Sequence, residues 1–162
     1  MLPQKVKRRR VLEGGQVRDP AITLDELTAK LAAEFPEAFH ADSSLSIMRI
    51  GYRVAHLRYA FRAASLRTGG TISGGVMMLL ADATMYVAVL ASIGWVPLAV
   101  TTNLSINFLK KPGPTALDAE CRLLKLGKRL AVGEIAIRSQ GDEELAAHAT
   151  STYSMPPGDR LR

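Results

Sequence analysis

The chain has one cysteine, three histidines and few aromatic side chains among its 162 residues. A single cysteine, Cys121, excludes an intramolecular disulfide framework and is typical of a reducing compartment, so we expect a cytoplasmic location. Cys121 lies in an alternating strand pattern with no histidine nearby in sequence, which predicts a small core residue and not a nucleophile. No second histidine stands at metal-ligand spacing from His56, so we expect no bound metal.

The positive charge of the chain is concentrated at its start. The net charge is +6, but the first ten residues hold five of the 21 basic side chains and no acid, so the remainder is nearly neutral. Residues 1–20 have too few apolar positions to offset the entropy of ordering, which predicts a solvated, disordered arm. We expect neither nucleic acid nor a membrane as its partner. No apolar segment follows the basic residues, so a secretory signal is not expected.

Residues 71–93, TISGGVMMLLADATMYVAVLASI, form an apolar stretch in which Asp82 is the only charged residue. A surface helix would show a polar stripe, so the stretch predicts either a buried helix or a membrane span of about 20 residues. Ser73 is the expected N-cap, Gly74 the first helical residue and Gly94 the end. No basic cluster flanks either end, which favours burial inside a water-soluble domain.

The segments on either side of this helix predict a sheet. Before it, Thr23 and Glu26 form a capping box for a covering helix over residues 22–35. In residues 45–67 the apolar side chains recur at close to every second position, with a kink near Gly51, which predicts one or two strands. Strand patterns separated by turn signals follow the central helix at residues 98–109, 116–126, 130–139 and 144–153. Their short connections predict antiparallel neighbours.

The expected fold class is therefore α+β, with one antiparallel sheet and one long helix lying across it. A single domain is expected over residues 21–155, followed by a tail at residues 156–162. A chain of this length is sufficient for one domain with a substantial core.

A carboxylate inside an apolar helix requires an explanation. Ionised Asp82 would cost several kcal/mol in an apolar site unless it is paired, hydrogen-bonded or close to a wet cleft. Among its neighbours three and four positions away on the helix, only Tyr86 offers a hydrogen bond. Asp82 is therefore a candidate for chemistry.

Three segments carry a resemblance to known proteins, namely ISGGVMMLLADA, VTTNLSINFLKKPGP and LLKLGKRLAVGEIAI. Over residues 45–153 the chain resembles the hotdog-fold acyl-CoA thioesterases of the phenylacetate-degradation type. The most specific part of the resemblance is the spacing from Gly74-Gly75 to Asp82. The resemblance implies that the sheet wraps around the central helix and that two protomers join their sheets edge to edge. It also implies hydrolysis of an acyl-CoA thioester without a separate cofactor, since coenzyme A is part of the substrate.

The resemblance also implies the roles of the catalytic residues. In such enzymes the acidic residue, here Asp82, attacks the thioester or activates water, and the glycine after a histidine, here Gly74, supplies an oxyanion-hole N–H. This chain has Ser73 in place of the histidine. As N-cap, Ser73 would accept the N–H of Gly75 or Val76 and leave the Gly74 N–H free at the positive end of the helix dipole. Asp82 would then act as general base or nucleophile.

Further candidates come from the same resemblance and from the charges at strand ends. Thr101 or Thr102 stands where the family often has a hydroxyl residue that orients water, and Asn103 is adjacent. Arg67 stands where the family often has an asparagine. The cations that could meet the phosphates of coenzyme A are Lys110, Lys111, Lys128 and Arg129.

The spacing within the helix predicts a shared site. Asp82 lies eight residues beyond Gly74, about 12 Å along the helix axis, whereas a base and an oxyanion donor must both lie within about 3 Å of atoms at one thioester carbon. Two antiparallel helices across a two-fold axis meet this requirement, so we expect a homodimer or a dimer of dimers. Two alternatives stay open, an acyl-CoA-binding or regulatory hotdog module without turnover, and a hotdog enoyl-CoA hydratase with an Asp-His pair.

Overall fold

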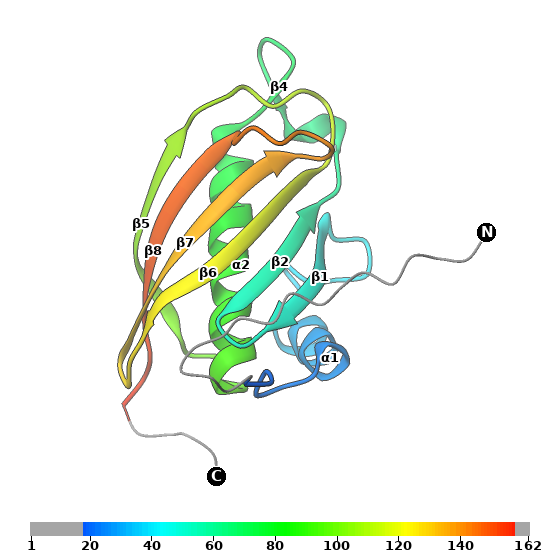
Figure 1. Cartoon of the computed structure of the whole chain (residues 1–162). Helices are drawn as coiled ribbons and strands as arrows, with labels where there is room; N and C mark the ends of the chain where they lie inside the picture. Colours follow the sequence, from blue (N-terminus) through cyan, green and yellow to red (C-terminus); the bar gives the residue numbers. More distant parts are fainter. Residues whose placement is uncertain (1–17, 158–162) are drawn as a thin grey trace, which may run out of the picture.

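A six-stranded antiparallel sheet curves around one long helix, α2 (Gly74–Ile93), in the residues that the computed structural model describes, 18–157 (Figure 1). The predicted α+β fold is confirmed. Most of the expected basic arm (1–20) and of the expected tail (156–162) lies outside the described residues. The strands, in the order in which they lie side by side, are β1 (Leu45–Gly51), β2 (Val54–Tyr59), β6 (Leu117–Leu126), β7 (Leu130–Ser139), β8 (Ala147–Ser154) and β5 (Val100–Phe108).

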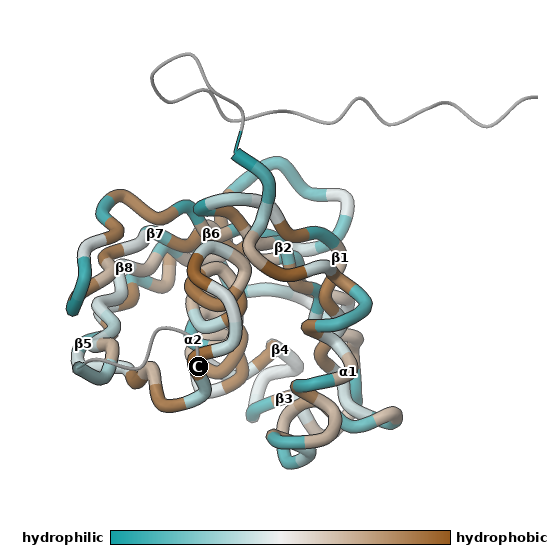
Figure 2. Tube along the Cα trace, turned by 90° about the horizontal axis from the view of Figure 1, so that it is seen from below, coloured by the Kyte–Doolittle hydropathy of each residue, from teal (hydrophilic) through white to brown (hydrophobic). Residues whose placement is uncertain are grey.

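Helix α2 begins and ends at the predicted residues. Ser73 is the N-cap and its hydroxyl accepts a hydrogen bond from Val76 N–H at 3.4 Å. The helix ends at Gly94, whose φ of 89° favours glycine. The helix is long and apolar enough to span a membrane, but 72% of its apolar window is buried inside the protein. Figure 2 shows the reason, since the sheet forms an arc around the helix.

The strand order corrects one expectation. Short connections predict that β5 and β6 are neighbours, but β5 pairs with β8. The hairpins β6–β7 and β7–β8 form a meander, and the other edge of β6 pairs with β2. No edge of β6 is left for β5, so the chain crosses the end of the sheet between these two strands (Figure 1). The outer edge of β5 pairs with none of the described strands.

Residues 45–67 form two strands and a connection to α2. Strands β1 and β2 make a tight hairpin, and its turn residue Arg53 has a φ of 63°. A 3₁₀ helix, η1 (Ala63–Ser65), and a two-stranded ribbon of β3 (Leu66–Arg67) and β4 (Thr71–Ile72) then lead to the N-terminus of α2.

The predicted covering helix is α1 (Leu24–Glu34), which lies beside β1 (Figure 2). Thr23 is its N-cap and accepts a hydrogen bond from Glu26 N–H at 3.2 Å, as the capping box predicts. Leu27 and Leu31 are fully buried and join the core formed by α2 and the inner face of the sheet. The predicted role of Cys121 as a core residue is confirmed, because its thiol is buried and burial raises its pKa to about 12.

Candidate active site

Asp82 is a half-buried carboxylate in the middle of α2, and two hydroxyl groups from the sheet bind it. Thr101 Oγ1 donates to Asp82 Oδ1 at 2.6 Å, and the phenol of Tyr153 donates to the same oxygen at 2.8 Å. These contacts explain how an apolar helix tolerates the charge, because hydrogen bonds to a carboxylate offset the cost of removing it from water. Tyr86, the neighbour expected from helical spacing, instead donates to the backbone oxygen of Pro97 at 3.2 Å.

The local structure of the sheet brings Thr101 and Tyr153 together. The two residues are cross-strand partners, Thr101 at the start of β5 and Tyr153 near the end of β8. A bulge lies between Thr101 and Asn103, and such bulges change the direction in which a side chain points. The Thr102 hydroxyl consequently donates to the backbone oxygen of Thr152, while Asn103 is exposed. Of the two threonines considered from sequence, Thr101 is the one at the carboxylate.

A cavity of about 500 Å³ opens beside Asp82 between α1, α2 and the start of β5. Its lining is mainly apolar, and its aromatic side chains are Phe35, Tyr86, Trp95 and Tyr153. Burial raises the pKa of Tyr86, with a further contribution from the charge of Glu34. A small set of polar groups in a mostly apolar cavity is typical of a ligand site. The cavity therefore has room for a small-molecule ligand next to the carboxylate.

The N-terminus of α2 presents backbone N–H groups. Gly74 N–H and Gly75 N–H donate no hydrogen bond to any residue within the described chain, while Ser73 accepts from Val76. An atom added at the Cβ position of Gly74 would lie 3.0 Å from Phe108 Cζ, so the ring of Phe108 packs against this turn of the helix. Free N–H groups at the positive end of a helix dipole stabilise an anion or a developing oxyanion.

Four of the predicted substrate-binding cations lie at two opposite ends of α2. Arg67 and Lys111 are exposed near its N-terminus, since Arg67 ends β3 and the residue after Lys111 accepts a hydrogen bond from Ile72 N–H. Lys128 and Arg129 are in the β6–β7 turn, and Lys128 lines a separate cavity with Ser92 and Ile93 near the C-terminus of α2. The structure therefore does not bring these four cations together.

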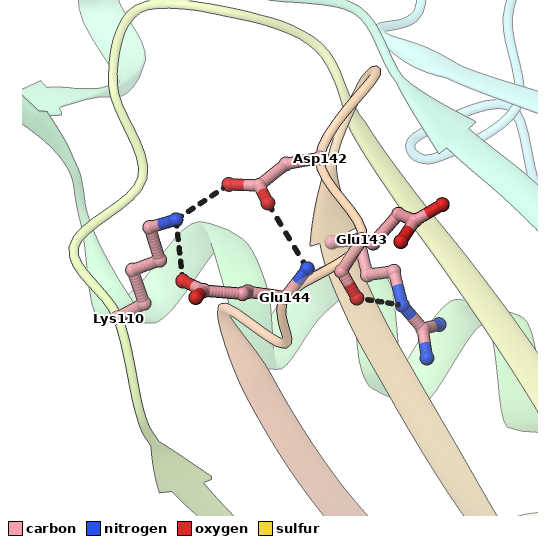
Figure 3. A network of polar contacts seen from close by, with 5 residues as sticks. Lys110, Asp142, Glu143 and Glu144 are labelled. Atoms are coloured by element: carbon pink, nitrogen blue, oxygen red, sulfur yellow. Dashed lines mark hydrogen bonds and ion pairs between the residues drawn. The ribbon is translucent and has the colours of Figure 1, made fainter.

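Lys110 is held by two carboxylates. Its ammonium group lies 2.7 Å from Asp142 Oδ2 and 2.7 Å from Glu144 Oε2 (Figure 3). These hydrogen bonds raise the pKa of Lys110 to about 12. The contacts join the loop after β5 to the β7–β8 turn, which Arg138 also braces through Glu143 O. Three charges that sum to a negative value are a poor site for a phosphate.

Sequence reasoning missed Tyr153. It is 71 positions from Asp82 in sequence and lies in a strand whose residues alternate between buried and less buried positions. A tyrosine at a buried position of such a strand is expected to be a core residue. The signal that could have found it is the hydroxyl group itself, because a buried phenol needs a hydrogen-bond partner. Burial raises the pKa of Tyr153, the hydrogen bond with the Thr101 hydroxyl lowers it by a smaller amount, and the neighbouring charge of Asp82 raises it further.

The sheet wrapped around one central helix defines the hotdog class of folds, and comparisons with known proteins identify the family. The thioesterase superfamily model matches residues 69–146. A candidate thioesterase from Silicibacter sp. TM1040 has a solved structure that is 41% identical, with a TM-score of 0.78, over 86% of this chain and 95% of that chain. The chain belongs to the thioesterase superfamily.

Two further relatives are more distant. A candidate esterase from Saccharolobus solfataricus is 36% identical over 101 residues, which are 61% of this chain and 65% of that protein, less than two thirds of its length. A mutant of the phenylacetic acid degradation protein from Thermus thermophilus is 23% identical, with a TM-score of 0.62, over 70% of this chain and 94% of that chain. At this identity the second likeness concerns the fold alone.

Proposed function

We propose that the protein hydrolyses an acyl-CoA thioester to the free acid and coenzyme A, with Asp82 as general base or nucleophile. The observation that carries the proposal is the position of Asp82, a hydrogen-bonded carboxylate on the core helix that lines an apolar cavity of about 500 Å³. An acyl chain suits the apolar wall, and the carboxylate suits attack on the thioester carbon or activation of water. Membership of the thioesterase superfamily supports the same chemistry.

The second part of the proposal is that Gly74 N–H stabilises the oxyanion and comes from a partner subunit. Along α2 the N–H of Gly74 and the carboxylate of Asp82 are separated by about 12 Å, too far for both to reach one thioester carbon. Exposed apolar side chains on α2 and β5 support association with a second copy. Met78 and Leu79 of α2 are 42% and 49% exposed, and Val100 and Phe108 of the unpaired strand β5 are 54% and 51% exposed.

The third part concerns the coenzyme A phosphates. Arg67 and Lys111 are the cations near the N-terminus of α2, where the oxyanion donor lies. We assign the phosphates to this pair and not to Lys110, whose ammonium group is already bound by two carboxylates. Lys128 and Arg129 belong to the other end of the helix.

An acyl-CoA panel with thiol detection tests the assignment of Asp82. Asp82→Asn keeps the shape of the side chain but is neither an anion nor a base, so we expect thiol release to fall at least about a hundredfold. The matched control is Asp118→Asn on β6, since Asp118 is also hydrogen-bonded but lies outside the cavity. Near-wild-type turnover of folded Asp82→Asn would refute the assignment. Saturable binding without thiol release would indicate a binding module, and hydration of an enoyl-CoA a hydratase.

A further inference from the structure

Both hydrogen bonds that the sheet makes to the Asp82 side chain end on one oxygen. Thr101 Oγ1 lies 2.6 Å and Tyr153 OH 2.8 Å from Oδ1, and no described residue donates to Oδ2. An oxygen that accepts two short charge-assisted hydrogen bonds has less remaining capacity to accept one from water. Oδ2 is therefore the oxygen available for chemistry.

Tyr153 is the more firmly held of the two donors. Its side chain is 3% exposed, whereas Thr101 is exposed on an edge strand. Its ring stacks on Tyr86 with the centroids 6.2 Å apart, and its hydroxyl also lies 3.2 Å from the backbone oxygen of Asp82. The ring cannot turn away without losing this packing. Because burial raises the pKa of Tyr153, the phenol stays protonated and remains a donor.

We propose that Tyr153 is a positioning residue, which with Thr101 fixes Oδ1 and so sets the plane of the Asp82 carboxylate, leaving Oδ2 to meet the attacking water. This inference rests on the proposed function, in the form in which Asp82 is the general base that activates water. It assigns a role to a residue on β8, the strand next to the one that carries Thr101.

The direction of the Thr101 hydrogen bond completes the arrangement. Its hydroxyl proton points to Oδ1, so Oγ1 can only accept a hydrogen bond from water. A water that donates to Oδ2 and to Thr101 Oγ1 keeps a lone pair for the thioester carbon. As the C–O bond forms, the proton passes to Oδ2. The C–S bond breaks when the tetrahedral intermediate collapses, and the leaving thiolate takes that proton from Asp82.

Tyr153→Phe tests the proposal, because it keeps the stacked ring and removes the donor. We expect kcat to fall about tenfold, the scale of one hydrogen bond to a charged group, with KM unchanged within about threefold. Tyr52→Phe, at the exposed β1–β2 hairpin, is the matched control.

A second measurement separates positioning from packing. In the Asp82→Asn background, Tyr153→Phe should cause less than about a twofold further loss, because the phenol acts through the carboxylate. If Tyr153→Phe does not fold, Thr101→Val should lower kcat by a similar factor, because it removes the other donor to Oδ1. Wild-type kcat in Tyr153→Phe, beside an inactive Asp82→Asn, would overturn the role of Tyr153 and leave the proposed function intact. Full activity of Asp82→Asn would overturn both.

Discussion

Replacing Gly74 by proline removes one N–H group from the N-terminus of α2 with little change to the backbone. Gly74 is the first residue of the helix, and its N–H has no partner within the described chain, so its loss breaks no helical hydrogen bond. Ser73 has φ −68° and ψ 150°, the region that residues before proline prefer. Gly74→Pro should therefore fold and lack only the proposed oxyanion donor.

Proline also adds a Cβ atom, which needs its own control. That atom would lie 3.0 Å from Phe108 Cζ and 3.3 Å from Phe108 Cε1, closer than ordinary contact. Phe108 is 51% exposed, so its ring can move away. Gly74→Ala adds the same atom and keeps the N–H. The difference between Gly74→Pro and Gly74→Ala is then the effect of the N–H group.

The expected size of that difference is large. Loss of one oxyanion-hole donor typically lowers kcat by about 10² to 10³, equivalent to about 3 to 4 kcal/mol of transition-state stabilisation. We expect Gly74→Ala to stay within about fivefold of the wild type and Gly74→Pro to lose at least about a hundredfold in thiol release. The rates are compared after circular dichroism has established that both variants are folded. Equal losses in the two variants would mean that crowding at Phe108 is responsible, and wild-type activity in Gly74→Pro would refute the donor.

The same variant tests whether the site is shared. Gly74→Pro and Asp82→Asn should each be nearly inactive alone. After co-refolding, half of the dimers would be hybrids with one doubly defective and one intact site, so roughly a quarter of wild-type activity should return in an isologous dimer. If hybrids form from folded parents and no activity returns, either one chain builds the site alone or Gly74 is not the donor.

Two further predictions concern charges outside the cavity. Partial burial raises the pKa of Asp118 and the hydrogen bonds from Arg58 lower it, so that the net pKa is below the ordinary 3.8. The ionised Asp118 side chain therefore stabilises the fold above pH 3.8, and this stabilisation is lost as the pH falls through the lower pKa of the folded state. Asp118→Asn should therefore lower Tm at neutral pH, and the loss of Tm should shrink as the pH falls below 3.8. A loss of the same size across this range would contradict the prediction. Lys110→Met should change the KM for acyl-CoA less than about threefold while Lys111→Met raises it about tenfold, and the reverse order would place the phosphates at Lys110.

Features that depend on neighbouring residues were predictable from the sequence. The cap at Ser73, the glycine end at Gly94 and the all-round apolar surface of α2 are local signals, and the helix has the expected bounds. The strands were also predictable from their period of two, but the pairing of β5 with β8 was not, because it depends on which sheet edge the long-range packing leaves free. Tyr153 was missed for the same reason, since only the β5–β8 register brings its hydroxyl to Asp82.

The register of β5 links both halves of the proposed site. Thr101, near the start of this strand, binds Asp82, and Phe108, at its end, packs against Gly74. Strand β5 therefore carries one residue beside the base and one beside the oxyanion donor. If two copies of its free edge pair antiparallel around a two-fold axis between Leu104 and Ser105, Thr101 of one protomer faces Phe108 of the partner subunit. The same pairing then brings the carboxylate of one protomer toward the free N–H of the other, which a single helix cannot do over about 12 Å. An unpaired edge strand with exposed apolar side chains is a surface that proteins normally cover, and covering it in this way would complete the site.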